Sequence, residues 1–123
     1  MSAEAQKAAT LRKSFDSPDE TRNISNGKVE VVNLGEVQAM RATFEPGWKW
    51  SEHVGQTTGA TSCEVELIGL VISGSAACRM NDGRYYEMKP GDLFYIGPGH
   101  DSWVVGDEPY VSLHFLGAEH YAS

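Results

Sequence analysis

The sequence predicts an all-β barrel or sandwich in one domain, preceded by a short N-terminal arm. Turn-forming Gly, Pro, Asn and Asp residues separate short apolar runs at intervals of about eight to twelve residues, which is typical of such folds. A chain of 123 residues can bury one core and is too short for two. Its hydrophobic content of 41% and its 13 glycines indicate a folded, turn-rich chain.

We expect residues 1–26 to form the arm and residues 27–123 to form the barrel. Residues 3–15 hold Ala, Gln, Lys and Leu with one β-branched Thr, which favours a short helix or an extended segment. The sequence DSPDE at residues 16–20 ends that segment. The turn dipeptide Asn26-Gly27 then precedes the first apolar run.

Nine strands follow from the alternating and apolar runs. We expect them at residues 28–33, 37–45, 49–53, 62–73, 76–80, 84–88, 92–96, 102–105 and 110–115. The Asp82-Gly83 dipeptide predicts a hairpin turn, because both residues tolerate positive φ. The Gly- and Thr-rich connection at residues 54–61 is long enough to serve as a lid at a barrel mouth.

Charge and cysteine content exclude several functions. The net charge of −7 and the scattering of 10 Lys and Arg argue against nucleic acid as a partner. No apolar run approaches the roughly 20 residues of a membrane helix, and the N-terminus lacks an export signal, so we expect a cytoplasmic protein without membrane contact. Cys63 and Cys78 show no metal-knuckle spacing and are expected to be free thiols.

The segment PGDLFYIGPGH at residues 90–100 carries a family resemblance. Together with Gly74 and the Asp82-Gly83 hairpin, it resembles the second half of the cupin signature. Gly47 stands six positions before His53, as in the first cupin motif. The resemblance covers roughly residues 35–115 and implies a small single-domain cupin, a β-barrel of the jelly-roll or double-stranded β-helix type.

The same resemblance implies a degenerate metal motif. Of the four positions that hold cupin metal ligands, only His53 carries a ligand, and the other three carry Gly55, Leu67 and Ser102. His100, two residues from one of these positions, is the second candidate ligand. Imidazole and thiolate groups suit zinc, iron, nickel or copper rather than calcium or magnesium, so the expected cofactor is one divalent transition metal or none.

Strand parity selects the residues expected inside the barrel. Residues two apart share a face, so Cys63 and Leu67 point the same way, as do His100 and Ser102. The candidate ligand-binding residues are Trp50, His53, Cys63, Leu67, Ser102 and His114. The candidates for moving a proton are His100 and Glu66, the latter only if a bulge near Gly69 turns it inward. Each histidine could equally be a packing residue, and Cys63 a small buried hydrophobic residue.

Two functions remain open at this point. One is a small-molecule-binding cupin with its pocket inside the barrel, with or without a metal. The other is a metal-dependent cupin enzyme, of isomerase, lyase or oxygenase type, acting on a small carbonyl or enolisable substrate. The sequence does not decide whether the protein is an enzyme. The resemblance also implies a homodimer, in which the arm would cover an edge strand of the partner.

Overall fold

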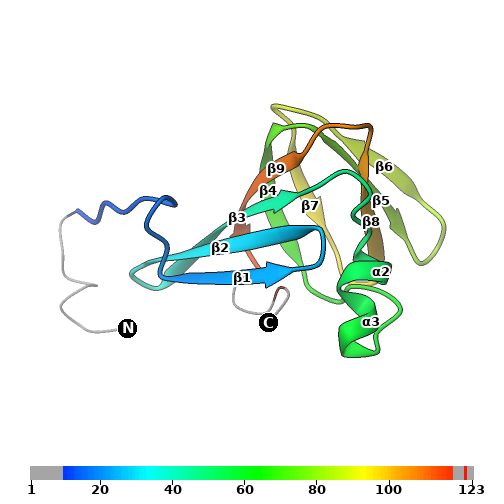
Figure 1. Cartoon of the computed structure of the whole chain (residues 1–123), viewed down its shortest axis with the longest axis horizontal. Coiled ribbons are helices and arrows are strands. Elements are labelled where there is room, and N and C mark those ends of the chain that lie inside the picture. Colours follow the sequence, from blue (N-terminus) through cyan, green and yellow to red (C-terminus); the bar gives the residue numbers. More distant parts are fainter. Residues whose placement is uncertain (1–9, 118–120, 122–123) are drawn as a thin grey trace.

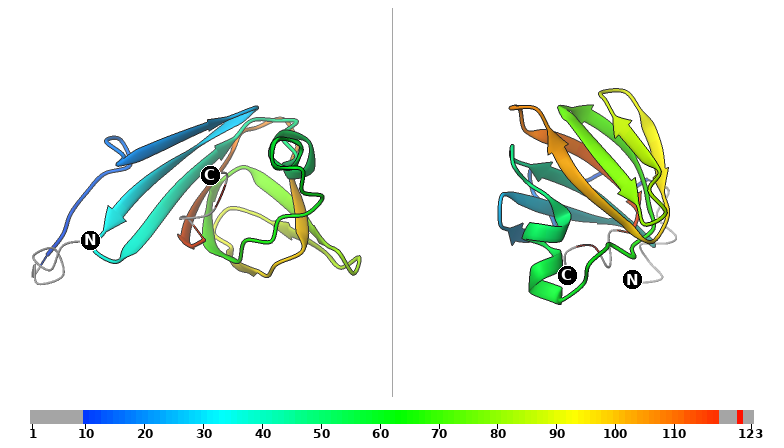
Figure 2. Two further views of the ribbon diagram at one scale, coloured as in Figure 1. Left: turned by 90° about the horizontal axis from the view of Figure 1, so that it is seen from below. Right: turned by 90° about the vertical axis from the view of Figure 1, so that its right-hand side faces the viewer.

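The computed structural model describes residues 10–117 and Tyr121, which fold into two antiparallel β-sheets packed face to face (Figures 1 and 2). This confirms the predicted all-β class. The elements in chain order are β1 (Glu20–Ile24), β2 (Gly27–Leu34), β3 (Val37–Phe44), α2 (Trp50–His53), α3 (Gly55–Thr58), β4 (Leu67–Ser73), β5 (Ser75–Met80), β6 (Tyr85–Met88), β7 (Leu93–Ile96), β8 (His100–Val105) and β9 (Tyr110–Leu116).

The chain alternates between the two sheets in its second half. The larger sheet has the strand order β1-β2-β3-β9-β4-β7, and the smaller has the order β6-β5-β8. The first crossing, from β4 to β5, is made at Gly74, whose φ is 73°. A side chain there would be strained, and its Cβ would collide with the carbonyl oxygen of Pro109. This crossing places β6 and β7 at neighbouring edges of the two sheets.

The predicted arm is shorter than expected because part of it belongs to the larger sheet. Residues 20–24 form β1, which pairs with β2 from Glu20 opposite Val31 to Ile24 opposite Gly27. Asn26, with φ of 62°, makes the tight turn between these strands. The Asn-Gly dipeptide therefore connects two strands of the sheet and does not separate the arm from the sheet. Residues 10–19 contain no helix. Residues 3–9 of the expected helix lie outside the described residues.

The strand predicted at residues 49–53 is wrong, because Trp50–His53 form a helical turn. The backbone N–H of His53 donates to the carbonyl oxygen of Lys49 over 2.9 Å. The Asp101 carboxylate, from β8, accepts hydrogen bonds from the Ser51 N–H at 2.9 Å and the Ser51 hydroxyl at 2.8 Å. A carboxylate at the first turn of a helix satisfies its free N–H groups, and here it comes from a distant strand that local sequence patterns do not reveal.

The core lies between the sheets and is rich in aromatic residues. Phe44, from β3, and Trp48, from the following loop, stack with ring centroids 3.8 Å apart. On β9 the buried residues Tyr110, Ser112 and His114 alternate with more exposed ones, as the predicted period of two requires, whereas β2 buries four consecutive residues and β5 buries three. The largest fully buried side chains are Trp48, Met40, His100, Val29, Val31, Val71, Cys63, Cys78 and Ser112.

Candidate functional site

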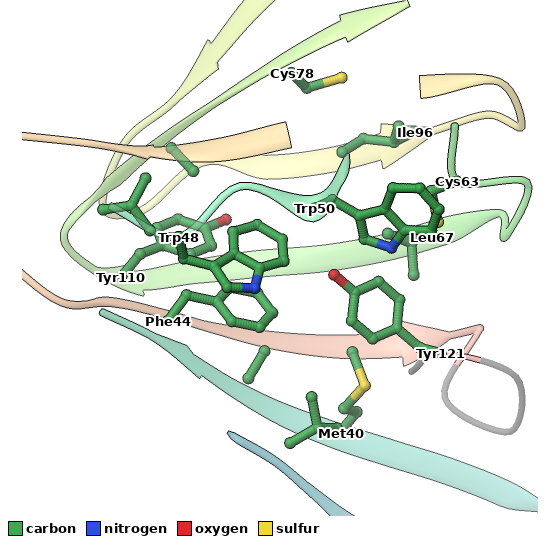
Figure 3. Close-up of a cluster of buried hydrophobic side chains, with 14 of the residues drawn as sticks. Met40, Phe44, Trp48, Trp50, Cys63, Leu67, Cys78, Ile96, Tyr110 and Tyr121 are labelled. Atoms are coloured by element: carbon green, nitrogen blue, oxygen red, sulfur yellow. The ribbon is translucent and has the colours of Figure 1, made fainter. Parts of the chain in front are cut away.

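The barrel interior is filled with packed side chains. Figure 3 shows Trp50, Leu67, Cys63 and Tyr121 gathered at one end of the cluster and Trp48 near its centre. Trp50, Cys63 and Leu67 were all expected to line a pocket, and each is at least 95% buried within the core. Burial raises the pKa of the Tyr121 phenol far above its ordinary value, so the phenol is neutral. These residues contribute packing surface to the interior.

His53 lies on α2, where its side chain is half-buried. Its Nδ1 atom lies 3.0 Å from the backbone nitrogen and 3.1 Å from the carbonyl oxygen of Lys49. In the neutral tautomer protonated on Nε2, Nδ1 accepts the hydrogen bond from the Lys49 N–H. This ring nitrogen therefore anchors the imidazole to the start of its own helical turn.

His100 and Cys63, each expected to face the barrel interior, are brought together in the structure. The two residues form an isolated antiparallel bridge, with the Cys63 N–H donating to the His100 carbonyl oxygen over 2.6 Å. The imidazole Nδ1 of His100 lies 2.7 Å from the carbonyl oxygen of Gly97, to which it donates. Burial lowers the pKa of His100 and raises the pKa of Cys63 to about 11. Both side chains are therefore uncharged at neutral pH.

Glu66 lies on the outer surface, so it does not face the interior as a proton-transfer role would require. Its carboxylate accepts a hydrogen bond from the phenol of Tyr95, and this bond raises the pKa of Tyr95. A register irregularity does occur between Ile68 and Gly69, but Glu66 remains exposed. Glu64 is exposed as well and accepts a hydrogen bond from the Ser62 hydroxyl.

Every second residue from Tyr110 to His114 on β9 is buried and carries a polar group. His114 faces inward, and its Nε2 lies 2.7 Å from the hydroxyl oxygen of Ser112. Its Nδ1 is buried with no partner among the described residues. Burial lowers the pKa of His114 to about 4 and raises the pKa of Tyr110 to about 12. The alternation Tyr110, Ser112, His114 is visible in the sequence, although only His114 was singled out from it.

An open cleft of about 480 Å³ lies where the edge strands β6 and β7 of the two sheets meet. Its most deeply buried lining residues are Cys78, Met88 and Ile96, each at least 92% buried. Met80 and Phe94 extend this apolar surface. The remaining lining residues are Arg84, Tyr86, Glu87, Asp92, Leu93, Tyr95 and Gly97. Sequence reasoning did not find this cleft.

The charged groups at the cleft are already paired. The Arg84 guanidinium lies 2.8 Å from the Asp82 carboxylate. The Glu87 carboxylate accepts from the Tyr85 phenol over 3.0 Å, and the Asp92 carboxylate accepts from the Lys89 N–H over 2.8 Å. The deep part of the cleft is neutral, because burial raises the pKa of the Cys78 thiol and keeps it protonated.

Solved structures of oxalate decarboxylases share this architecture. The formate complex of the Lactobacillus farciminis enzyme is 19% identical, with a TM-score of 0.57 over 80% of this chain and 30% of that chain. A variant of the Bacillus subtilis enzyme is 22% identical, with a TM-score of 0.59 over 80% of this chain and 28% of that chain. The chain has the cupin fold.

The chain spans less than a third of the length of the decarboxylases it matches. A further structure comes from work on the Mn(II) centres of Bacillus subtilis oxalate decarboxylase. It is 25% identical, with a TM-score of 0.54 over 78% of this chain and 27% of that chain. No protein-family model and no curated protein matches the sequence. Within residues 10–117 and Tyr121, none of the helices has the length and apolar character needed to cross a membrane.

The side chains of this chain do not fit the metal that the cupin resemblance implies. Across the described part of the chain, no three His, Cys, Asp or Glu side chains are grouped so that they could hold an ion. Leu67, at the position where the resemblance places a glutamate ligand, packs into the apolar core. The partnerless Nδ1 of His114 lies on a ring flanked by the rings of Phe94 and Tyr121, at centroid distances of 5.5 and 6.3 Å. Neither position offers the charged, convergent ligands that a divalent ion prefers.

Ser102, the last of the expected ligand-binding residues, stands on β8 opposite Cys78. It is partly buried, and its backbone N–H donates to Asp101 over 2.9 Å. A second hollow of about 480 Å³ lies beside the last residues of β5 and the first residues of β8, and it is lined by Lys49, Arg79, Met80, Asn81, Asp101 and Trp103. The Lys49 ammonium sits 5.5 Å from the centre of the Trp103 ring, a cation–π contact that stabilises this surface.

Proposed function

We propose that this protein is a small-molecule-binding cupin whose ligand occupies the cleft between β6 and β7. The proposal rests on the volume of the cleft and on its mainly apolar lining. A volume of about 480 Å³ lies in the range of roughly 300–1,000 Å³ that is typical of ligand sites. An apolar inner surface with a few polar groups at the opening is also typical of them.

The cleft surface favours an uncharged ligand with an aromatic or alicyclic ring. Cys78, Met80 and Met88 supply polarisable sulfur atoms, with the Cys78 Sγ and Met80 Sδ atoms 3.9 Å apart. Such side chains adapt to flat rings, and the Phe94 ring adds an edge or face for stacking. Tyr86, half exposed at the opening, offers one phenol for a polar substituent of the ligand.

The alternative function, a metal-dependent enzyme, draws support from the fold shared with oxalate decarboxylases, one of them described with Mn(II) centres. The side chains here favour binding instead. His100 and Cys63 are buried and neutral, and Glu66 faces outward. No His, Cys, Asp or Glu cluster suited to a metal occurs among residues 10–117 and Tyr121. The proposed function therefore includes no chemical step.

Binding of the uncharged fluorophore N-phenyl-1-naphthylamine tests the proposal. We expect saturable fluorescence enhancement with the wild type and at least about tenfold weaker binding to Gly97→Phe. Gly97 lines the cleft, and a Cβ there would meet only a ring carbon and the phenol oxygen of Tyr95, each at 3.8 Å. The protein should therefore accept a larger residue at this position, and the phenyl group should obstruct the opening.

Gln56→Phe is the matched control, because Gln56 is an exposed residue of α3 and does not line the cleft. It adds the same phenyl group to the surface and should bind the fluorophore as the wild type does. Equal affinity of the wild type and Gly97→Phe would mean that the fluorophore binds elsewhere and that the cleft is not the site.

A further inference from the structure

The second hollow lies on the outer face of the smaller sheet, which is formed by β6, β5 and β8 (Figure 1). Strand register brings its side chains to this one face. Arg79 on β5 stands opposite both Tyr85 on β6 and Asp101 on β8. Trp103, two residues after Asp101, points the same way and forms an isolated bridge with Lys49. Arg79 is exposed, so this face is the one turned away from the core.

Two cations and two aromatic rings are in contact across this face. The Lys49 ammonium lies 5.5 Å from the centre of the Trp103 ring. The centre of that ring lies 6.1 Å from the centre of the Tyr85 ring. The Arg79 guanidinium in turn lies 5.9 Å from the centre of the Tyr85 ring. The aromatic pair therefore links the two cations and helps to hold each of them in place.

The positive charge of the hollow is only partly neutralised. Asp101 supplies the single carboxylate among the described residues that line the hollow, and its oxygens already accept hydrogen bonds from the N–H and the hydroxyl of Ser51. The Lys49 ammonium lies 4.0 Å from it. Within the part of the chain that the structure describes, no carboxylate pairs with the Arg79 guanidinium. The Glu87 carboxylate, near this face, accepts from the Tyr85 phenol.

This arrangement fits a small ligand that joins a carboxylate to a flat ring. The planar N–H groups of a guanidinium match the two oxygens of a carboxylate, and the Lys49 ammonium adds a second positive charge. Trp103 offers a flat apolar surface and Met80 an adaptable one. The volume of about 480 Å³ is in the range of roughly 300–1,000 Å³ that is typical of small-molecule sites.

We propose that this hollow is a binding site for small aromatic carboxylates, with the carboxylate held by Arg79 and Lys49 and the ring placed against Trp103. The site differs from the cleft in chemistry, because the cleft favours an uncharged ligand. It also differs in position, since Met80 is the one described residue that lines both. The proposal does not depend on what the cleft binds.

Titration of ¹⁵N-labelled protein with 2-naphthoate, followed by NMR, tests the proposal. The indole N–H resonance of Trp103 should shift, with a Kd below about 1 mM. The indole resonances of Trp48 and Trp50 should stay in place, because both side chains are at least 95% buried in the core. The uncharged 2-naphthamide, which has the same ring system, should bind at least about tenfold more weakly.

Arg79→Gln removes the guanidinium at an exposed side chain and should weaken 2-naphthoate binding at least about tenfold. Arg12→Gln is the matched control, because Arg12 is exposed, does not line the hollow, and its loss changes the net charge equally. It should bind as the wild type does. Gly97→Phe, which obstructs the cleft, should also bind 2-naphthoate with unchanged affinity.

Three results would overturn the proposal. The first is a Trp103 resonance that does not move at about 10 mM 2-naphthoate, tenfold above the expected Kd. The second is equal affinity of the wild type and Arg79→Gln for 2-naphthoate, or equal affinity of the wild type for 2-naphthoate and 2-naphthamide. The third is loss of 2-naphthoate binding in Gly97→Phe, which would place the carboxylate in the cleft.

Discussion

Acidification from about pH 7 to pH 4 is expected to remove roughly 3 kcal/mol of stability through His114 alone. The pKa of this imidazole falls to about 4 in the folded protein because burial disfavours its charged form, whereas its ordinary value is 6.5. Unfolding therefore takes up a proton between these two values. The contribution of His114 is fully present above about pH 6.5 and is lost as the pH falls towards 4.

Urea unfolding at a series of pH values, on the wild type and His114→Gln, measures this contribution. The variant has no titrating group at position 114, so its stability should fall less steeply between about pH 6.5 and 4. The carboxylates common to both proteins cancel in the difference. Gln56→Ala, at an exposed residue of α3 with no titrating side chain, is the control and should follow the wild type. Parallel curves for wild type and His114→Gln would show that the imidazole is hydrated in solution.

Leu67→Glu is expected to lower the free energy of unfolding by about 3–5 kcal/mol without creating a metal site. Leu67 is 4% exposed and lies in the same apolar cluster as Trp50 and Ile96, so a carboxylate there would be buried without a partner. Restoring a carboxylate at the family's ligand position does not restore the other ligands, because Gly55 and Ser102 occupy two of their positions.

Chemical unfolding and elemental analysis after incubation with Mn(II) and Zn(II) check this expectation. Val37→Glu places the same group at a side chain that is 54% exposed and should cost less than about 1 kcal/mol. A well-folded Leu67→Glu protein that retains one equivalent of either ion would contradict the packing described for the barrel interior.

The fold could be predicted where the sequence pattern is local. The predicted strand at residues 110–115 coincides with β9 to within one residue, because alternation and flanking turns fix such strands. The strand Glu20–Ile24 has no apolar alternation and is held by its pairing with β2, so its sequence did not indicate it. The helical turn Trp50–His53 depends on Asp101, fifty residues away, and local patterns do not report such a contact.

The candidate site was predicted only in part, for a related reason. Parity together with the cupin resemblance placed Cys63 and Leu67 inside, and His114 was expected to face inward from the last strand; all three are buried in the structure. The cleft depends on which strands lie at the edges of the two sheets, and strand order cannot be inferred from parity. Met88 and Phe94 therefore went unnoticed, although both belong to predicted strands.

The most direct test of ligand binding in the cleft is a methyl NMR titration of protein labelled with ¹³C at its methionine methyl groups. Met80 and Met88 line the cleft, whereas Met40 is fully buried in the core and does not. On addition of N-phenyl-1-naphthylamine, we expect the Met80 and Met88 resonances to shift by ring current and the Met40 resonance to stay in place. A shift of Met40 with unmoved Met80 and Met88 would place the ligand inside the barrel and contradict the account.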